Sequence, residues 1–222
     1  MIYRVEKIKQ DVRIAMDQNM VTDELFESGD IDSLMLDEII QSKLVEAVER
    51  VHMMAPYHLL ELGHNCCDVD PDDPSDDDVL YWADKESGWV VLPDDFMRLV
   101  VFEMSDWERP VYSPITQDDP EYAKQRSRIK ALRGTAQRPV CALVMRPTGR
   151  VLEFYSCKSE DATVKRAIYV PYPYIDRDGG VDISERCYTA VVSMAAGLTL
   201  TSCGEADKAG LFFDMAKTYL EK

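Results

Sequence analysis

The chain has 222 residues, of which 46% are apolar and 30% charged, and its formal net charge at pH 7 is −16. This apolar content is sufficient for a buried core and excludes a wholly disordered chain, while the acidity opposes general binding to a phosphate backbone. The length suits one large domain, or one domain with a second inserted into it.

The N-terminal part of the chain has helical periodicity. Apolar residues at three- and four-residue steps predict an amphipathic helix over Ile2–Met16. A second helix is expected to begin with Asp32 or Ser33 as its N-cap and to end before Pro56. A short helical turn is expected to follow over Tyr57–Leu62.

The middle of the chain has the pattern of strands and turns. Residues 79–82 and 89–92 flank a polar, glycine-containing turn and predict a β-hairpin. Residues 140–145 and 151–155 predict a second hairpin around a Pro-Thr-Gly turn.

Between and after these hairpins, further short elements are expected. Pro93–Asp95 reads as a turn that caps a short helical turn, and Leu99–Met104 reads as a strand. Ala167–Val170 reads as another strand, halted by Pro171 and Pro173.

Helical periodicity returns at the C-terminal end. Asp182 or Ser184 can cap a helix that extends to Thr199, Gly204 ends it, and Ala206–Leu220 forms a last helix.

We therefore expect an α+β fold, with a helical bundle formed by N- and C-terminal helices and a β-rich insertion between them. The helical core is expected to comprise residues 1–66 and 180–222, and the insertion residues 67–179. Within the insertion we expect an acidic loop over 68–78 and a basic arm over 124–138.

The basic arm is part of the most unusual segment of the chain. The 27 residues Lys124–Arg150 contain eight Lys/Arg and no Asp or Glu, and no aromatic residue interleaves with the cations. A base-stacking surface is therefore not expected, which leaves contact with an acidic protein surface or with passing DNA phosphates. We favour a protein surface, that of an identical neighbour, because each copy carries its own acidic complement. The expected interface residues are Lys124, Arg126, Arg128, Lys130, Arg133 and Arg138 with Asp72, Asp73, Asp76 and Asp77.

Seven aspartates lie within eleven residues of the acidic loop: Asp68, Asp70, Asp72, Asp73, Asp76, Asp77 and Asp78. Their alternation suits a hard cation such as calcium, but the positions of the turn glycine and of the bidentate glutamate hold other residues. A solvated acidic loop is the favoured interpretation, with metal coordination and electrostatic docking as alternatives.

Other candidate sites are weaker. His58, His64, Cys66 and Cys67 have side chains that zinc prefers, but they lack the paired spacing of structural zinc sites, so we expect packed side chains and reduced thiols. No histidine lies in a catalytic frame and no glycine-rich phosphate loop is present. We expect neither an enzyme nor a bound metal or cofactor. Because no apolar stretch is long enough, we expect no secretion signal and no membrane span.

One local segment and the overall layout resemble a known family. Trp89–Val100 reads WVVLPDDFMRLV and is similar to an LPxDFxRL segment of phage proteins from gut Bacteroidales viruses. The helix–sheet–helix layout resembles the head-to-tail connector (adaptor) proteins of tailed bacteriophages, related to the tail tubular protein of short-tailed phages.

The resemblance implies a virion protein of the neck or tail, assembled in the host cytoplasm. It would form a homo-oligomeric, twelvefold ring between the portal protein and a tail or second ring protein. The helices would line or support a channel for the transient passage of double-stranded DNA. The alternatives are a small acidic inhibitor or DNA mimic, and a metal-dependent hydrolase built on the aspartates.

Overall fold

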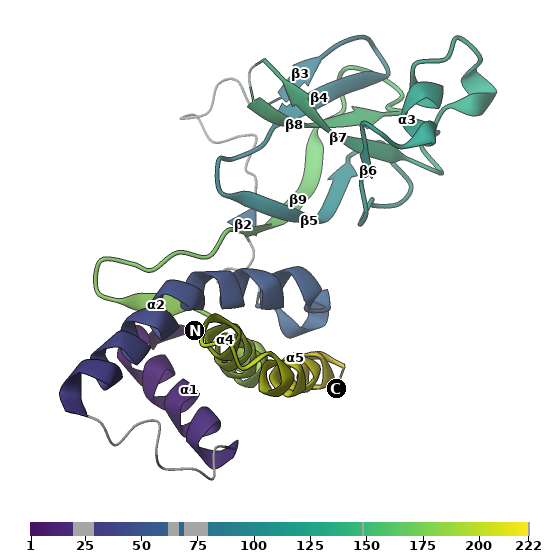
Figure 1. The fold of residues 1–222 in the computed structure, drawn as a ribbon. Coiled ribbons are helices and arrows are strands. Elements are labelled where there is room, and N and C mark those ends of the chain that lie inside the picture. The colour runs from purple at the N-terminus through teal and green to yellow at the C-terminus, as the bar shows by residue number, and fades with distance from the viewer. Residues whose placement is uncertain (20–28, 62–66, 69–79, 148, 222) are drawn as a thin grey trace. The chain divides into compact units, whose positions relative to one another are not determined.

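A computed structural model describes residues 1–19, 29–61, 67–68, 80–147 and 149–221. The chain divides into two compact units, which are Met1–Asn65 together with Tyr172–Lys222, and Cys66–Pro171. The long helices belong to the first unit and most strands to the second (Figure 1). The expected mixed α+β class is confirmed.

Four helices make up most of the first unit, with one of them at its centre. They are α1 (Val5–Asn19), α2 (Gly29–Met54), α4 (Tyr188–Ser202) and α5 (Ala206–Leu220). Helix α4 contacts the other three (Figure 1) and is buried on all sides from Ala190 to Leu200, because its sequence is apolar all round.

The N-terminal residues form a strand instead of the start of the first helix. Strand β1 (Ile2–Arg4) pairs antiparallel with β10 (Gly180–Asp182), and the terminal ammonium of Met1 donates to Asp182 Oδ1 at 2.9 Å. The prediction of a helix from Ile2 is therefore wrong by one turn, because a pairing with a segment far along the chain satisfies this backbone. Ile2 is 66% exposed and does not belong to the apolar stripe of α1.

The other helical elements of this unit follow the predicted order. Helix α2 begins at Gly29, three residues before the first predicted cap. The 3₁₀ helix η2 spans Tyr57–Leu59 within the predicted helical turn, and η4 (Glu185–Cys187) precedes α4.

The second unit contains two sheets. The larger has the order β3 (Leu80–Trp82), β4 (Ser87–Val91), β8 (Gly149–Tyr155), β7 (Val140–Arg146) and β6 (Ile115–Thr116). The smaller has the order β2 (Cys67–Asp68), β9 (Val164–Pro171) and β5 (Phe96–Met104).

Both predicted hairpins are present in the larger sheet. Strand β3 pairs antiparallel with β4, and β7 pairs antiparallel with β8. The turn between β7 and β8 ends at Gly149, whose φ of 118° is readily adopted only by glycine.

The short helical turn expected after Pro93–Asp95 is wrong. Phe96 N donates to Pro93 O at 3.0 Å in a tight turn, and strand β5 begins directly at Phe96. Phe96 and Leu99 are both buried in the core between the two sheets, so packing extends the strand toward the turn.

The two faces of the larger sheet are covered differently. One face shares a core with the smaller sheet, in which Phe154 of β8 packs with Phe102 of β5. The opposite face is covered by the segment that contains α3 (Pro120–Gln125) and the 3₁₀ helix η3 (Lys130–Leu132), through the buried ring of Tyr122. This second face carries the candidate site.

Candidate functional site

The acidic half of the predicted interface cannot be placed. Asp72, Asp73, Asp76 and Asp77 lie outside the described residues, as does the greater part of the aspartate run. Among the described residues, no group of three or more His, Cys, Asp or Glu is placed to hold a metal ion. No described helix is long and apolar enough to cross a membrane.

Two of the weaker histidine and cysteine candidates, His58 and Cys67, lie among the described residues. His58 lies in η2, where its carbonyl oxygen accepts a hydrogen bond from Arg186 at 3.1 Å. Cys67 is in β2, and His64 and Cys66 lie outside the described part of the chain.

The basic segment is a folded cover on the sheet, which differs from the expected long exposed arm. Asp119 caps α3, and the buried side chain of Gln125 accepts a hydrogen bond from Gly134 N at 2.8 Å. Arg133 Nε donates to the carbonyl of Ser127, which closes the segment on itself. The sequence could not show this because Tyr122, which anchors the segment on the sheet, bonds to Glu153, 31 residues away.

Four of the six predicted cations have acidic neighbours within the chain. Lys124 pairs with Glu121, Lys130 and Arg133 both lie against Glu86, and Arg126 Nη2 lies 3.8 Å from Glu153 Oε1.

The other two predicted cations lie at exposed positions. Arg128 and Arg138 are exposed and make no ion pair among the described residues. Between them, Ile129 and Leu132 are 60% and 49% exposed. We call Arg128, Ile129, Leu132 and Arg138 the exposed basic turn.

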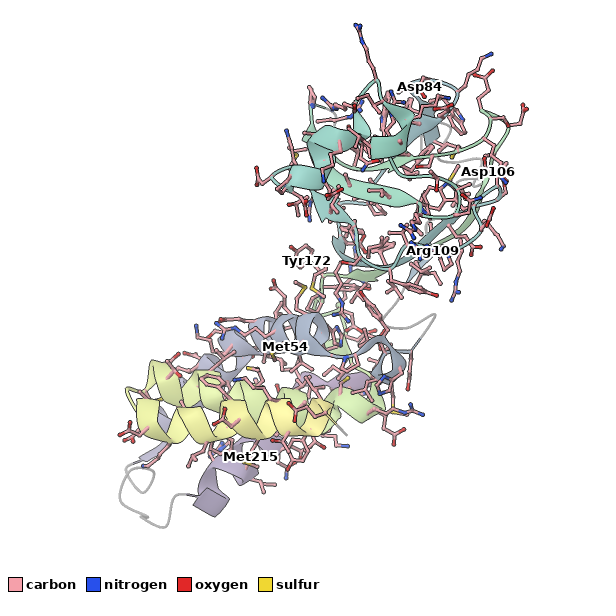
Figure 2. The ribbon with its side chains drawn as sticks, turned by 90° about the vertical axis from the view of Figure 1, so that its right-hand side faces the viewer. Met54, Asp84, Asp106, Arg109, Tyr172 and Met215 are labelled. Atoms are coloured by element: carbon pink, nitrogen blue, oxygen red, sulfur yellow. The ribbon has the colours of Figure 1, made fainter. Side chains whose placement is uncertain are left out.

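Beside this turn the second unit contains a polar cavity of about 370 Å³, within the size range of small-ligand sites. Its walls come from the β3–β4 turn, the end of β8 and the basic segment. Asp84, which lies in the β3–β4 turn, is labelled in Figure 2. The polar lining residues are Asp84, Glu86, Ser87, Gln125, Arg126, Arg133, Arg146, Glu153, Tyr155 and Ser156.

The floor of the cavity is a buried carboxylate. Glu153 lies on the central strand β8, between Trp89 of β4 and Ala142 of β7, and its side chain is 4% exposed. Its Oε1 accepts hydrogen bonds from Arg146 Nε and Nη2 at 3.1 and 2.7 Å. Its Oε2 accepts from the hydroxyl groups of Tyr122 and Tyr155. The carboxylate is therefore fully satisfied by the protein.

These contacts set the ionisation of the cluster. Burial alone would raise the pKa of Glu153, but hydrogen bonds from Tyr155, Arg146 and Tyr122 and the charge of Arg146 outweigh it, so its pKa lies below its ordinary value. Burial, followed by the adjacent Glu153 carboxylate, raises the pKa of both Tyr155 and Tyr122. At neutral pH the floor is an anion hydrogen-bonded by two neutral phenols and a guanidinium.

Aromatic residues hold the guanidinium of Arg146. Its central carbon lies 3.8 Å from the ring centroid of Trp89, and Trp89 stacks on Tyr81 with centroids 5.3 Å apart. Because the stack and the two hydrogen bonds to Glu153 fix the guanidinium plane, Arg146 is a preorganised part of the cavity.

The wall near the end of β8 has an unusual backbone. Ser156 has a φ of 80°, a left-handed conformation that is uncommon for residues other than glycine. Its buried Oγ has no hydrogen-bond partner in the part of the chain that the structure describes, and a Cβ on the facing Gly134 would lie 2.7 Å from it. Gly134 therefore allows the basic segment to approach the strand closely.

Sequence reasoning missed Glu153, Tyr155, Tyr122 and Trp89, and it assigned Arg146 no role beyond the basic segment. One signal was present, because Glu153 is the only charged residue in the apolar run Val151–Tyr155. A charge inside a strand that is otherwise apolar on both faces indicates a buried, paired group.

No protein-family model matches the chain, and no curated protein matches it.

Proposed function

We propose that this protein is a structural subunit of an oligomeric ring, of the kind found in the head-to-tail connectors of tailed bacteriophages. In this role it would join the portal protein to a tail or second ring protein, extend and seal the DNA channel, and reside in the virion after assembly in the host cytoplasm. The layout and the LPxDFxRL-like segment support the proposal by resemblance.

The observation that carries the proposal is the exposed basic turn. Two arginines without an ion pair among the described residues and two exposed aliphatic side chains lie within eleven residues of a protein whose net charge is −16. Such a surface combines the apolar contact and the charge complementarity of a protein interface. Asp72, Asp73, Asp76 and Asp77 of a neighbouring copy are the proposed counterpart, so that the contact repeats head to tail and closes into a ring.

The helical unit has the proposed role of the bundle that lines or supports the channel. Its support is that α4 contacts α1, α2 and α5, which brings helices from both ends of the chain into one unit. An acidic protein would repel passing DNA, which favours free transit of the duplex.

The test reverses the charge of those cations that form no ion pair among the described residues. Arg126 and Lys130 contact Tyr122, Glu153 and Glu86, so their reversal would also disturb the unit. The double variant Arg128→Glu/Arg138→Glu is expected to remain folded but to fail to form rings, scored by mass photometry and by electron microscopy with the native particle.

The control is Lys158→Glu, which changes charge at an exposed position of the same unit outside the basic segment. It is expected to assemble like the wild type. Normal assembly of the double variant, or a wild-type chain that is a strict monomer and does not associate with particles, would contradict the proposal.

A further inference from the structure

We propose that the cavity above Glu153 is a binding site for a single carboxylate group, held by Arg126 and Arg133. The site stands without ring assembly. Only the assignment of its occupant, an acidic side chain of a neighbouring subunit, rests on the proposed function.

The Glu153 carboxylate at the floor of the cavity is closed to ligands. Both oxygens of Glu153 already accept two hydrogen bonds each, and Arg146 offsets its charge at 2.7 Å. A ligand cation or donor would have to displace a guanidinium or a phenol from a buried group, at the cost of leaving that group unpaired.

The walls of the cavity carry N–H donors that no described residue uses. Arg126 uses Nη2 for Tyr122 Oη at 2.8 Å, and its Nε and Nη1 have no partner among the described residues. Arg133 uses Nε for the Ser127 carbonyl, and its Nη1 lies 3.8 Å from Glu86 Oε2, too far for a hydrogen bond. Two guanidinium groups therefore face one cavity with unused N–H groups, which match the planar geometry of a carboxylate.

Three cations, Arg126, Arg133 and Arg146, and three carboxylates, Asp84, Glu86 and Glu153, line the cavity, so the charges of its lining balance. Lys130, which lies outside the lining, pairs with Glu86 and offsets that carboxylate from outside the cavity. Asp84 is engaged by its own turn, because its Oδ1 accepts from Glu86 N, Ser87 N and Ser87 Oγ.

This balance favours a monoanion over a phosphate or a polyanion. The lining has no excess positive charge that a dianion would neutralise, and the net charge of −16 opposes the approach of anything more negative than a monoanion. The side chain of Arg133 is 28% exposed, so water screens its charge less than it screens a fully exposed cation.

The test titrates the wild-type protein with N-acetyl-aspartate N-methylamide, which carries one carboxylate. Its asparagine counterpart is the neutral control, and inorganic phosphate is the dianion. Chemical shifts of the arginine Nε–H groups report the contact. We expect saturable shifts of Arg126 and Arg133 with the aspartate probe, none with the asparagine probe and weaker binding of phosphate. No saturable binding, or shifts spread over all arginines, would overturn the site.

Two matched double variants then locate it. Arg126→Ala/Arg133→Ala is expected to lower the affinity for the probe at least tenfold, whereas Arg128→Ala/Arg138→Ala, on the same segment but outside the cavity, is expected to keep it within twofold. Equal losses in both variants would show attraction by the whole basic segment and overturn the site.

Ring assembly tests whether a neighbouring subunit supplies the carboxylate, independently of whether the cavity binds one. If a neighbouring subunit supplies it, Arg126→Ala/Arg133→Ala also weakens ring formation. A variant that binds no probe and still assembles normally would overturn that source and leave the ring proposal standing.

Discussion

Arg146 donates two hydrogen bonds to a single oxygen of Glu153, at 3.1 and 2.7 Å, while its guanidinium lies over the ring of Trp89. The two residues belong to adjacent antiparallel strands, seven positions apart in sequence. This pair organises the second face of the larger sheet, because the phenols of Tyr122 and Tyr155 converge on the other oxygen of the same carboxylate. A charged pair at the centre of an apolar face links the basic segment to the sheet beneath it.

Removing the charge of Glu153 should destabilise the second unit. Glu153→Gln keeps the shape of the side chain but loses the ion pair and replaces one of the two acceptor oxygens with an NH₂ group. We therefore expect a loss of about 2–4 kcal/mol in the free energy of unfolding. Urea denaturation followed by tryptophan fluorescence measures it. The control is Glu121→Gln. Because Lys124, the ion-pair partner of Glu121, is exposed, this substitution should lower the free energy of unfolding by less than about 0.5 kcal/mol. Equal effects of the two substitutions would show that the buried pair contributes no more to stability than the exposed pair.

Because the pKa of Glu153 is lowered, the free energy of unfolding should depend on pH in the acidic range. Because the folded pKa lies below the unfolded value, the unfolded chain binds the proton first, and the contribution of Glu153 is complete above the ordinary pKa of glutamate and is lost as the pH falls through the folded pKa. We therefore expect the wild type to lose stability more steeply than Glu153→Gln below about pH 4.5. Urea midpoints measured from pH 7 to pH 3 test this, and parallel curves would contradict it.

The elements that could be predicted from the sequence are those whose signals lie within a short stretch of the chain. Both hairpins and the last two helices have their turn residues and periodicity within one short segment, and the structure contains them. Strand β1 was missed because its partner, β10, lies almost 180 residues away.

The basic segment was misread for a similar reason. Four of its cations pair with carboxylates outside the segment. Lys130 and Arg133 lie against Glu86 of the β3–β4 turn. Arg126 and Arg146 lie against Glu153 of strand β8. The cavity is formed by the same pairings between residues distant in sequence, so no local sequence pattern predicts it.

The raised pKa values of Tyr155 and Tyr122 predict late ionisation of these phenols. Burial and the Glu153 carboxylate favour the neutral form, so their contribution to stability is complete below the ordinary tyrosine pKa of about 10 and is lost as the pH rises through the folded values. In a ¹³C NMR titration, we expect Tyr155 to remain neutral above the ordinary tyrosine pKa of about 10. Tyr155→Phe should remove one late-titrating resonance, and ionisation of Tyr155 at about pH 10 would contradict the described cluster.

Two glycine substitutions should have opposite effects because their surroundings differ. A Cβ on Gly88 of β4 would lie 2.2 Å from the carbonyl oxygen of Tyr81 and 2.6 Å from Phe154 Cζ, and a backbone atom cannot move aside as a flexible side chain can. We expect Gly88→Ala to destabilise the second unit by about 3 kcal/mol. Gly210 of α5 has open space at its Cβ position, so Gly210→Ala should stabilise the helical unit by about 0.5–1 kcal/mol through helix propensity. Hydrogen exchange resolves the two units, and we expect faster exchange confined to Cys66–Pro171 in the first variant and slower exchange of α5 in the second. Exchange that accelerates equally in both units on Gly88→Ala would show that the two units unfold as one.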